Sequence, residues 1–391
     1  MTPVRIPLSN PDITQAEIDA VTAVLRTSRL SLGPELEAFE AELAAYHSLD
    51  HAVAVSSGTA GLHLALLVLG VGEGDQVILP SFSFVAVANV VLQVRATPVF
   101  VEIDPLTLNL DPFAVEQAIT PRTRAILAVD TFGVPAQMDA LQAIAQRHGL
   151  ALLEDACEAV GARFGDPPTD CRAGSFGDLA VLGFYPNKQL TTGEGGAVLC
   201  RDAALAKRLR SLRNQGRNTE ANPSAATVPG SPESSAWLDH VEWGYNYRLS
   251  EMACALGRVQ LRRLEAMLAL REAAARRYDA LLAPIPGLER PPLILPRRSI
   301  SWFVYAVRLP QHVDRDHVQS ILTARGIATG RYFPPIHLQP AWRGHASAAV
   351  RLPLTEAIAR RMIALPFFNR ITADQQQQVA EALGEAILAC K

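Results

Sequence analysis

The sequence predicts an α/β protein with a mostly parallel central sheet, followed by a smaller α+β domain. Between residues 50 and 200, short β-rich runs alternate with helical patterns, and the strand candidates are almost continuously apolar. Such strands indicate a sheet that helices cover on both faces. At 391 residues the chain exceeds a usual single core, so we expect two domains, residues 1–248 and 249–391.

The first domain should contain at least five strands. The candidates are HAVAV (51–55), DQVILP (75–80), ATPVFVEID (96–104), RAILAVDTF (124–132) and LALLEDA (150–156). Helical patterns follow the first two, and MDALQAIAQRHG lies between the last two. The intervening GVGEGD (70–75) is interpreted as a turn, because it follows a helix and lacks the spacing of a dinucleotide fingerprint. Active groups on such a sheet gather at the carboxyl ends of its strands.

The second half of the chain begins with a polar, proline-rich stretch at residues 217–237, which predicts a long surface loop. A long amphipathic helix follows over residues 249–282 and should connect the two domains. The remainder mixes a strand candidate, SWFVYAVRL, with the helical patterns HVQSILTARG and ADQQQQVAEALGEAIL. This mixture predicts the α+β second domain.

Composition argues against several classes of function. The formal net charge is −3, and 19% of residues are charged, so no basic excess favours nucleic acid or anionic membrane. No apolar stretch approaches the roughly 18 residues of a membrane span, and the N-terminus has no apolar signal core. The five cysteines lack CxxC spacing and the nine histidines lack HExxH pairing. We therefore expect a cytoplasmic protein with reduced thiols and no metal site.

One lysine stands apart from the other basic residues of the chain. The chain has 36 basic residues, of which only Lys188, Lys207 and Lys391 are lysines. Lys188 lies between an apolar run and a glycine-rich turn, in FYPNKQLTTGEGGAVL (184–199). Unlike arginine, lysine can lose its proton near neutral pH and attack a carbonyl group. Lys188 is thus either a nucleophile or a lysine that only extends from a strand end to solvent.

Two further motifs could serve the same site. SSGTAGLHLA (56–65) is a small-residue turn entering a helix, which can bind phosphate or be an ordinary N-terminal cap. LLEDACEAVGA places Glu154, Asp155 and Glu158 at the end of an apolar strand. A buried acid there needs a cation or a hydrogen-bond donor, and a protonated heterocyclic nitrogen is one such partner. A phosphate cradle, a carboxylate and a nucleophilic lysine are together what pyridoxal 5′-phosphate (PLP) requires.

With these motifs in view, the sequence resembles the DegT-type nucleotide-sugar aminotransferases over nearly its whole length. The matching blocks are SRLSLGPELEAFEAELAAY, AVSSGTAGLHLAL, PSFSFVAVANVVL, ATPVFVEIDPLTLNLDP, LLEDACEAVGA, GFYPNKQLTTGEGGAV, GYNYRLSEMACALGRVQL, RYFPPIH and LPFF. The resemblance implies PLP-dependent transferase fold type I and a homodimer with shared active sites. It also implies transfer of an amino group from L-glutamate to a nucleotide-linked ketosugar, with pyridoxamine 5′-phosphate as the intermediate form of the cofactor.

The resemblance assigns roles by position. Lys188 would form the Schiff base, and Asp155 would bind the pyridine nitrogen. Gly58, Thr59 and Ala60 would hold the phosphate, Phe84 would stack on the ring, and Asn246 would reach the phosphate from the neighbouring subunit. The candidates for sugar binding are Tyr185, Arg248, Arg331, Tyr332 and His337.

Two cofactor-site positions depart from the common family pattern. Gly183 stands where many members have a serine that donates to the phosphate, so that contact should be missing or supplied by backbone or water. Glu158 occupies a place more often held by Gln or His, although perosamine-synthase-like members share it. A carboxylate there could alter the pKa of the nearby imine or be protonated itself. Because Lys188 is retained, the dehydratase branch, which has histidine instead, is disfavoured.

The expected function is therefore PLP-dependent amination of a nucleotide-linked keto-deoxysugar, most commonly a 4-keto-6-deoxyhexose that gives a 4-amino sugar. A 3-keto sugar or an aminocyclitol precursor is also compatible with the sequence. Another PLP enzyme of the same fold, such as a lyase or an amino-acid aminotransferase, is the main alternative. A non-catalytic regulatory relative is the third, and the intact Lys188 and Asp155 argue against it.

Overall fold

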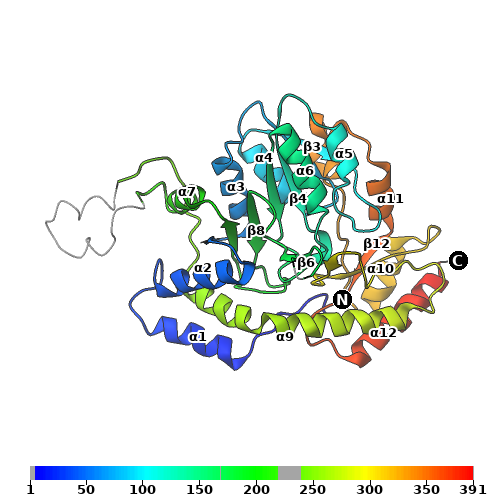
Figure 1. Ribbon diagram of the computed structural model, residues 1–391. Helices are drawn as coiled ribbons and strands as arrows, with labels where there is room; N and C mark the ends of the chain where they lie inside the picture. The colour runs from blue at the N-terminus through cyan, green and yellow to red at the C-terminus, as the bar shows by residue number, and fades with distance from the viewer. Residues whose placement is uncertain (1–4, 168, 219–238, 391) are drawn as a thin grey trace.

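The computed structural model describes residues 5–167, 169–218 and 239–390, and its centre is a seven-stranded sheet (Figure 1). In spatial order the strands are β1 (His51–Val55), β9 (Gly196–Cys200), β8 (Leu179–Gly183), β5 (Ala151–Asp155), β4 (Thr123–Val129), β2 (Gln76–Pro80) and β3 (Thr97–Val101). Strand β9 is antiparallel to both of its neighbours, and the other adjacent pairs are parallel. The predicted α/β class is thus confirmed.

The strands are apolar along their whole length because both faces of the sheet are covered. Alternate side chains enter different cores: Val77 and Leu79 of β2 pack with α3 and α4, whereas Ile78 packs on the opposite face with α6. Strand β8 divides in the same way, with Val181 facing α3 and Leu182 facing α2 and α9. This alternation is the period of two that a β-strand imposes on its side chains.

Helices surround the sheet and extend along its lower edge in Figure 1. Their bounds are α1 (Gln15–Leu25), α2 (Pro34–His47), α3 (Gly58–Val68), α4 (Ala86–Gln93), α5 (Pro112–Gln117), α6 (Met138–His148), α7 (Ala203–Arg213), α9 (Glu251–Leu282), α10 (Arg315–Ala324), α11 (Pro353–Arg361) and α12 (Ala373–Leu388). The helices predicted over 249–282 and 373–388 are both present, as α9 and α12. None of the helices that the structure describes combines the length and apolarity needed to cross a bilayer.

A second core lies at the C-terminal side, where α10, α12 and the end of α9 pack on a two-stranded sheet (Figure 1). Its strands are β11 (Tyr305–Arg308) and β12 (Met362–Leu365). Ile6 also belongs to this core and pairs with Ile327, so the N-terminal segment packs on the C-terminal part of the chain. The domain boundary at residue 248 stays a prediction, and most of the predicted loop at 217–237 lies outside the described residues.

A small sheet joins the two parts of the chain. It contains β6 (Arg163–Phe164), β7 (Cys171–Arg172) and β10 (Arg298–Ser299), in the order β10-β6-β7. Next to it, the turn η1 (Thr131–Gly133) follows β4 and bonds to the segment before β11. The main-chain N–H of Ser301 donates to the carbonyl of Gly133 at 3.0 Å, and that of Phe303 donates to Phe132 at 3.3 Å. Residues 131–133 and 301–303 therefore form one continuous wall.

Two acids meet inside the protein where β4 and β5 end. Asp130 and Glu154 are both fully buried, and Glu154 accepts hydrogen bonds from the N–H groups of Gly174 and Phe176 at 2.6 and 2.9 Å. Burial, together with the nearby charge of Glu154, raises the pKa of Asp130 well above its ordinary value. Asp130 therefore keeps its proton to a higher pH in the native state than in the unfolded chain.

Replacing Asp130 with asparagine should make stability less dependent on pH. A group whose pKa is raised by folding binds a proton in the native state that the unfolded chain has released, so wild-type stability falls as pH rises above the unfolded pKa of about 3.9. The fall is limited to about 1.4 kcal/mol per pH unit. Urea unfolding at pH 5 and 8 should show a smaller difference for Asp130→Asn than for wild type. The surface variant Asp19→Asn is the control, and equal pH dependence in all three proteins would contradict this prediction.

Candidate active site

A cavity of about 480 Å³ opens at the carboxyl edge of the sheet. It lies beyond the ends of β1, β5 and β8, as the sequence predicts for parallel strands. The predicted site residues that line it are Gly58, Thr59, Phe84, Asp155, Glu158, Gly183, Tyr185, Lys188 and Tyr332. Residues more than 270 positions apart in the chain are thus brought together around one space.

Lys188 is held in the cavity by contacts at both ends of its side chain. Its main-chain N–H donates to the carbonyl of Tyr185 at 2.9 Å, which closes a turn five residues beyond β8. Its Nζ lies 3.4 Å from Oε1 of Glu158 and 3.9 Å from the centre of the Phe303 ring. The side chain is only 13% exposed. Lys188 is therefore not a lysine that extends to solvent from a strand end.

Glu158 is buried and connects the lysine to the wall formed by residues 131–133. Its Oε2 accepts the main-chain N–H of Phe132 at 3.0 Å while Oε1 faces Lys188. Burial raises the pKa of Glu158, and the positive charge of Lys188 and the N–H of Phe132 only partly offset this effect. The carboxyl group can therefore either pair with the lysine as an anion or carry a proton itself.

Asp155 ends β5 and is almost completely buried. It accepts a hydrogen bond from the main-chain N–H of Cys157 at 3.1 Å. Burial raises its pKa, and the bonds from Cys157 and the charge of Lys188 offset part of the rise. A cation placed against this carboxylate would remove much of the cost of its burial, so Asp155 suits a protonated ring nitrogen.

The N-terminus of α3 faces the cavity and can bind an anion. The first N–H groups of a helix have no partner within the helix and carry partial positive charge. Gly58 is the first residue of α3, and a Cβ there would lie 2.8 Å from Sγ of Cys157, so α3 packs too closely against this thiol for any residue but glycine. Ala60 differs from the expectation, since its N–H donates to the Ser57 hydroxyl at 3.0 Å. Of the three residues predicted to bind phosphate, Gly58 and Thr59 line the cavity, and their role stays a prediction.

Cys157 explains why position 183 carries glycine. A Cβ on Gly183 would lie 3.0 Å from Sγ and 3.1 Å from Cβ of Cys157. The thiol occupies the space that a serine at 183 would need, and it contacts the carbonyl of Val181 at 3.7 Å. The glycine and the cysteine are therefore a matched pair at the edge of the phosphate cradle.

A Gly183→Ser variant should be destabilised by about 1–3 kcal/mol, because an added side chain in a packed site forces its neighbours to move. Adding Cys157→Ala should recover part of this loss, since it removes Sγ, 3.0 Å from the added Cβ, but keeps the Cβ of residue 157 at 3.1 Å. Urea unfolding of the two single variants and the double variant measures this coupling. Equal stability losses for Gly183→Ser in the presence and absence of the thiol would show that the two positions are independent.

Aromatic rings form the remaining walls. Phe84 is 60% exposed and Tyr185 is 53% exposed, both unusual values for aromatic side chains that line a cavity. On the opposite side, Phe303 and Tyr332 stack with an interplanar angle of 7° and ring centres 6.2 Å apart. Exposed rings at the mouth of a pocket can stack on a flat ligand, and Phe84 is placed for that role.

Five of the predicted site residues do not line the cavity: Ala60, Asn246, Arg248, Arg331 and His337. Asn246 is exposed and its main chain pairs with Asn214, and Arg248 donates to the side chains of Asn214 and Gln215 at 2.9 and 3.1 Å. Arg331 pairs with Asp316 of α10 at 2.9 Å. The predicted role of Asn246 in a neighbouring subunit stays a prediction.

His337 does not fit the predicted role in sugar binding. Its side chain is fully buried, with Nδ1 2.6 Å from the Ser81 hydroxyl and Nε2 3.5 Å from Glu356. Both ring nitrogens are thus used inside the protein. The RYFPPIH motif contributes Tyr332 and Phe333 to the cavity instead.

Sequence reasoning missed several residues of the site. Phe303 lies under the lysine, Asn187 hydrogen-bonds to Tyr332, and Cys157 fills the space beside Gly183. Asn187 and Cys157 are adjacent to recognised motif residues and could have been considered for that reason. Phe303 belongs to a run whose apolar pattern indicates only a strand, so no local signal marks it.

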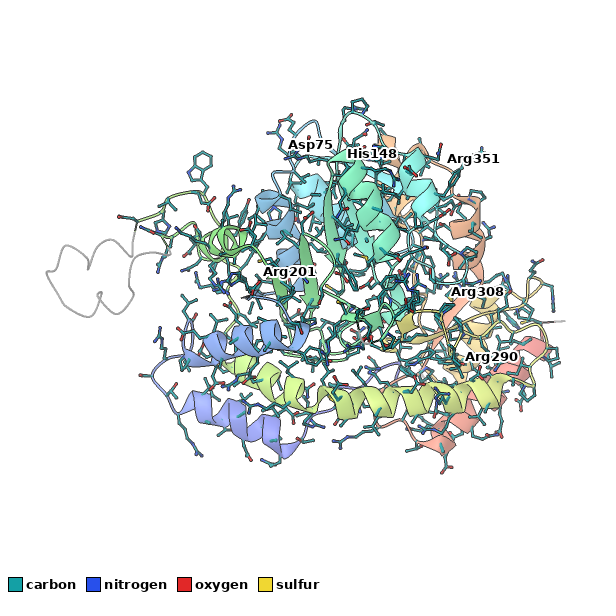
Figure 2. All side chains as sticks on the ribbon, viewed as in Figure 1. Asp75, His148, Arg201, Arg290, Arg308 and Arg351 are labelled. Atoms are coloured by element: carbon teal, nitrogen blue, oxygen red, sulfur yellow. The ribbon has the colours of Figure 1, made fainter. Side chains whose placement is uncertain are left out.

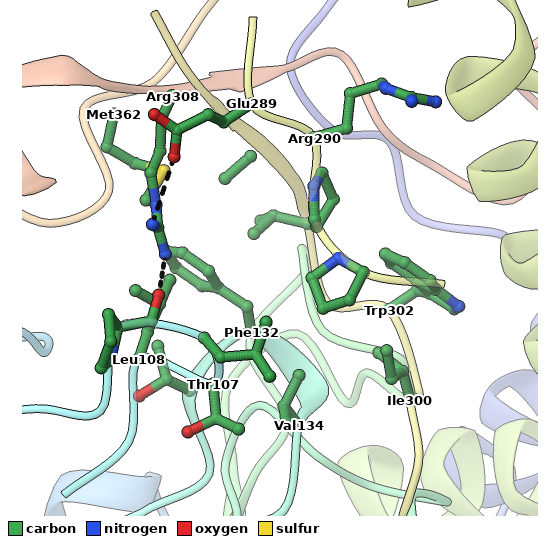
Figure 3. Close-up of a pocket in the computed structure, with 17 residues that line it drawn as sticks. Thr107, Leu108, Phe132, Val134, Glu289, Arg290, Ile300, Trp302, Arg308 and Met362 are labelled. Atoms are coloured by element: carbon green, nitrogen blue, oxygen red, sulfur yellow. Dashed lines mark hydrogen bonds and ion pairs between the residues drawn. The ribbon is translucent and has the colours of Figure 1, made fainter. Parts of the chain in front are cut away.

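A second cavity, of about 380 Å³, lies on the other side of the same wall (Figure 3). Phe132 and Trp302 line it, whereas the next residue, Phe303, lines the first cavity. At its rim Arg308 bonds to Glu289 and to the carbonyl of Pro105, as Figure 3 shows. Figure 2 places Arg308 on the C-terminal side of the molecule, away from α7. None of its described lining residues belongs to the predicted site.

Comparison with known families identifies the chain. The model of the DegT/DnrJ/EryC1/StrS aminotransferase family matches residues 11–384. The chain belongs to this family. Its resemblance to nucleotide-sugar aminotransferases, inferred from ordered sequence blocks, is therefore confirmed.

Individual relatives agree with the family. The dTDP-3-amino-3,4,6-trideoxy-alpha-D-glucose transaminase of Streptomyces venezuelae is 42% identical over 374 residues, which cover 95% of this chain and 92% of that protein. The crystal structure of S. venezuelae DesV in complex with a ketimine intermediate has a TM-score of 0.86 at 41% identity, with 99% of each chain covered. The PMP form of Spr1654, a Streptococcus pneumoniae protein classed with the sugar aminotransferases, has a TM-score of 0.90 at 26% identity and covers 99% of this chain and 100% of that one.

This member of the DegT/DnrJ/EryC1/StrS family is a sugar aminotransferase with PLP as its cofactor. The cavity fits that cofactor on three independent points. The N-terminus of α3 borders the cavity at Gly58 and Thr59, where it can bind a phosphate; Asp155 is a buried acid that a cation would stabilise; and Lys188 lines the same space with its side chain only 13% exposed.

Proposed function

We propose that this enzyme transfers the amino group of L-glutamate to the C3 carbonyl of a dTDP-linked 3-keto-4,6-dideoxyhexose. The observation that carries the proposal is the 42% identity to a transaminase whose named product bears its amino group at C3. The products would be 2-oxoglutarate and the 3-amino sugar, so nitrogen, electrons and protons balance between the two substrates.

The choice of C3 departs from the 4-keto sugar that the family resemblance favoured. That preference came from the substrates common in the family as a whole. The S. venezuelae relative covers 95% of this chain, and a relative of this extent is a better guide to regiochemistry than the family average. The 4-keto-6-deoxyhexose is therefore the competing acceptor in the test below.

The residues of the cavity have separate tasks in this proposal. When bound, PLP supplies the electron sink that makes the proton at the reacting carbon removable. Gly58 and Thr59, which line the cavity at the start of α3, would bind its phosphate through main-chain N–H groups, and Phe84 would stack on its ring. The Asp155 carboxylate, which also lines the cavity, would bind the ring nitrogen and favour its protonated form.

Lys188 would hold the cofactor through its Nζ and would also serve as the acid and base of the reaction. Its free Nζ would take a proton from the α-carbon of L-glutamate in the first half of the cycle. In the second half it would give a proton to the sugar carbon. Glu158 and Phe303 keep Nζ within the cavity during these steps, because they contact it at 3.4 and 3.9 Å.

The homodimer and the cytoplasmic location also belong to the proposal. Asn246 is exposed, and Trp243, in the same segment before α9, is 99% exposed. A fully exposed tryptophan is uncommon on a monomer surface, and a neighbouring subunit would cover it. In such a dimer Asn246 would bind the phosphate in the partner's cavity, and Arg248 and Tyr185 would contact the nucleotide sugar.

The proposal is tested by supplying L-glutamate with dTDP-linked 3-keto and 4-keto acceptors in separate reactions. Formation of 2-oxoglutarate should require the 3-keto sugar, and NMR of the product should place nitrogen on C3. An enzyme that aminates only the 4-keto sugar would refute the proposed transfer to C3. It would instead support the 4-keto acceptor that the family resemblance implied. An enzyme that aminates amino-acid or aminocyclitol ketones but neither sugar would refute the substrate class.

A further inference from the structure

Arg271 is a buried charge in the middle of α9 with no acid to neutralise it. Its side chain lies inside the protein, and the residue is only 4% exposed. Among the residues that the structure describes, no carboxylate lies within ion-pairing distance of its guanidinium group. Its hydrogen bonds all go to main-chain carbonyl oxygens.

Those three carbonyl groups come from two segments of the active site. Nη1 donates to Trp302 at 3.3 Å, and Nη2 donates to Asn187 at 3.5 Å and to Lys188 at 3.4 Å. One guanidinium group thus bridges the turn that carries the lysine and the segment that carries Phe303. The planar fork of arginine can reach both segments at once, which a lysine could not do.

This arrangement is costly to the fold. A buried cation without a paired acid loses several kcal/mol of hydration free energy. Burial lowers the pKa of Arg271 to about 10, and its Nε has no hydrogen-bond partner in the described structure. The ring of Phe367, 5.5 Å from the guanidinium carbon, compensates only weakly. A feature that costs stability and touches the active site indicates a functional role.

The position of Nζ depends on both segments that Arg271 joins. The lysine backbone sets where its side chain starts, and the Phe303 ring supports its end at 3.9 Å. Phe303 is in turn bonded to Phe132, whose N–H binds Glu158. If the two segments separated, Nζ of Lys188 would lose its contact with the Phe303 ring, and its distance to Glu158 would change.

We propose that Arg271 is a positioning residue for Lys188, holding the lysine turn against the Trp302–Phe303 segment so that Nζ faces the cofactor carbonyl. Arg271 does not line the cavity itself and acts through the main chain. The inference rests on the proposed role of Lys188. Arg271 should therefore affect the formation of the covalent link between PLP and the protein more than the binding of the PLP phosphate.

The test separates these two steps in the apoenzyme. Non-covalent binding of PLP is followed by quenching of tryptophan fluorescence, and covalent attachment by growth of the visible absorption band. Borohydride reduction followed by peptide mass spectrometry identifies the attached lysine. The variants are Arg271→Gln, Arg271→Lys and, as a control, Arg262→Gln, an arginine of the same helix whose side chain is 60% exposed and paired with Glu42.

Arg271→Gln should attach PLP at least about tenfold more slowly with little change in non-covalent affinity, because small displacements of reacting groups have large effects on rate. Arg271→Lys keeps the charge but not the fork, and should be slowed by a smaller factor. If Arg271→Gln does not fold, the rate of PLP attachment in Arg271→Lys tests the inference instead. Arg262→Gln should match wild type.

Attachment within twofold of the wild-type rate in a folded Arg271 variant would overturn the inference. Binding and attachment that fall together, in step with the melting temperature, would also overturn it by showing a purely structural role. If wild-type protein is not trapped at Lys188, the proposed function fails and the role of Arg271 fails with it. Trapping at Lys188 in wild type leaves Arg271 to be judged by the variants alone.

Discussion

Lys188→Ala is expected to abolish turnover, with a loss of about 10⁴-fold or more, because in the proposed mechanism this one side chain both holds the cofactor and moves the proton. The visible absorption band of bound PLP should disappear as well, since no other described lysine lines the cavity. Enzyme assays and an absorbance spectrum of the same preparation measure the two effects together.

A second variant separates chemistry from folding. Lys188→Ala leaves Glu158 buried without its cation, so part of any loss could come from lower stability. Lys188→Arg keeps a positive charge beside Glu158 but cannot form the covalent link. Lys207→Ala, on the exposed side of α7, is the matched control. Near-normal turnover in either Lys188 variant would remove the lysine from the mechanism.

Asp155→Asn is expected to lower kcat by about 10²- to 10³-fold, the usual effect of removing an electrostatic group from a reacting centre. Asparagine has nearly the same shape but cannot carry the negative charge that a protonated ring nitrogen requires. Because the phosphate contacts are untouched, PLP should still bind, and KM for L-glutamate should change less than kcat. Steady-state kinetics on protein saturated with PLP measure this separation.

The contrary outcome for Asp155 is equally specific. A variant with bound PLP and kcat within twofold of wild type would show that the ring nitrogen does not depend on this carboxylate. Loss of PLP binding with normal turnover at high PLP would instead assign Asp155 to affinity. The buried neighbour Glu154 is a poor control, because it bonds to the N–H groups of Gly174 and Phe176.

Much of the fold follows from patterns that are local in the sequence. The strand predicted at 51–55 matches β1, and the helix predicted at 373–388 matches α12, because hydrophobic periodicity and turn residues fix both ends. Strand β9 was not predicted. Its antiparallel direction depends on pairing with β1 and β8, which are about 145 and 15 residues away in the chain, and no local pattern records such pairing.

The residues of the site also fall into two groups, those that local sequence motifs indicate and those that only the packing reveals. Lys188, Asp155 and Gly58 could be proposed from the sequence because each lies in a short motif, and the three motifs together indicate PLP although none does so alone. Phe303 and Arg271 could not, since an aromatic residue in a strand and an arginine in an amphipathic helix look like ordinary core and surface residues. A role for these two residues in the site is indicated only by the packing of α9 against residues 187–188 and 302–303.

The contact between Cys157 and Gly183 shows a further feature that could not be predicted from the sequence. The sequence reveals a glycine where a serine is common, but the reason lies on a different segment of the chain. The thiol of Cys157 fills the space, 26 residues earlier and one strand away. A departure from a family pattern can thus be a compensated substitution whose partner is visible only in three dimensions.

The most direct test of the account is an absorbance spectrum of the purified enzyme through one complete cycle. L-glutamate should convert the visible band of the PLP form to the near-ultraviolet band of the PMP form, and a dTDP-linked 3-keto-deoxysugar should then restore the visible band. A visible band that glutamate leaves unchanged would contradict the proposed donor. Protein that stays colourless after PLP is supplied would contradict the assignment of Lys188 and, with it, the whole account.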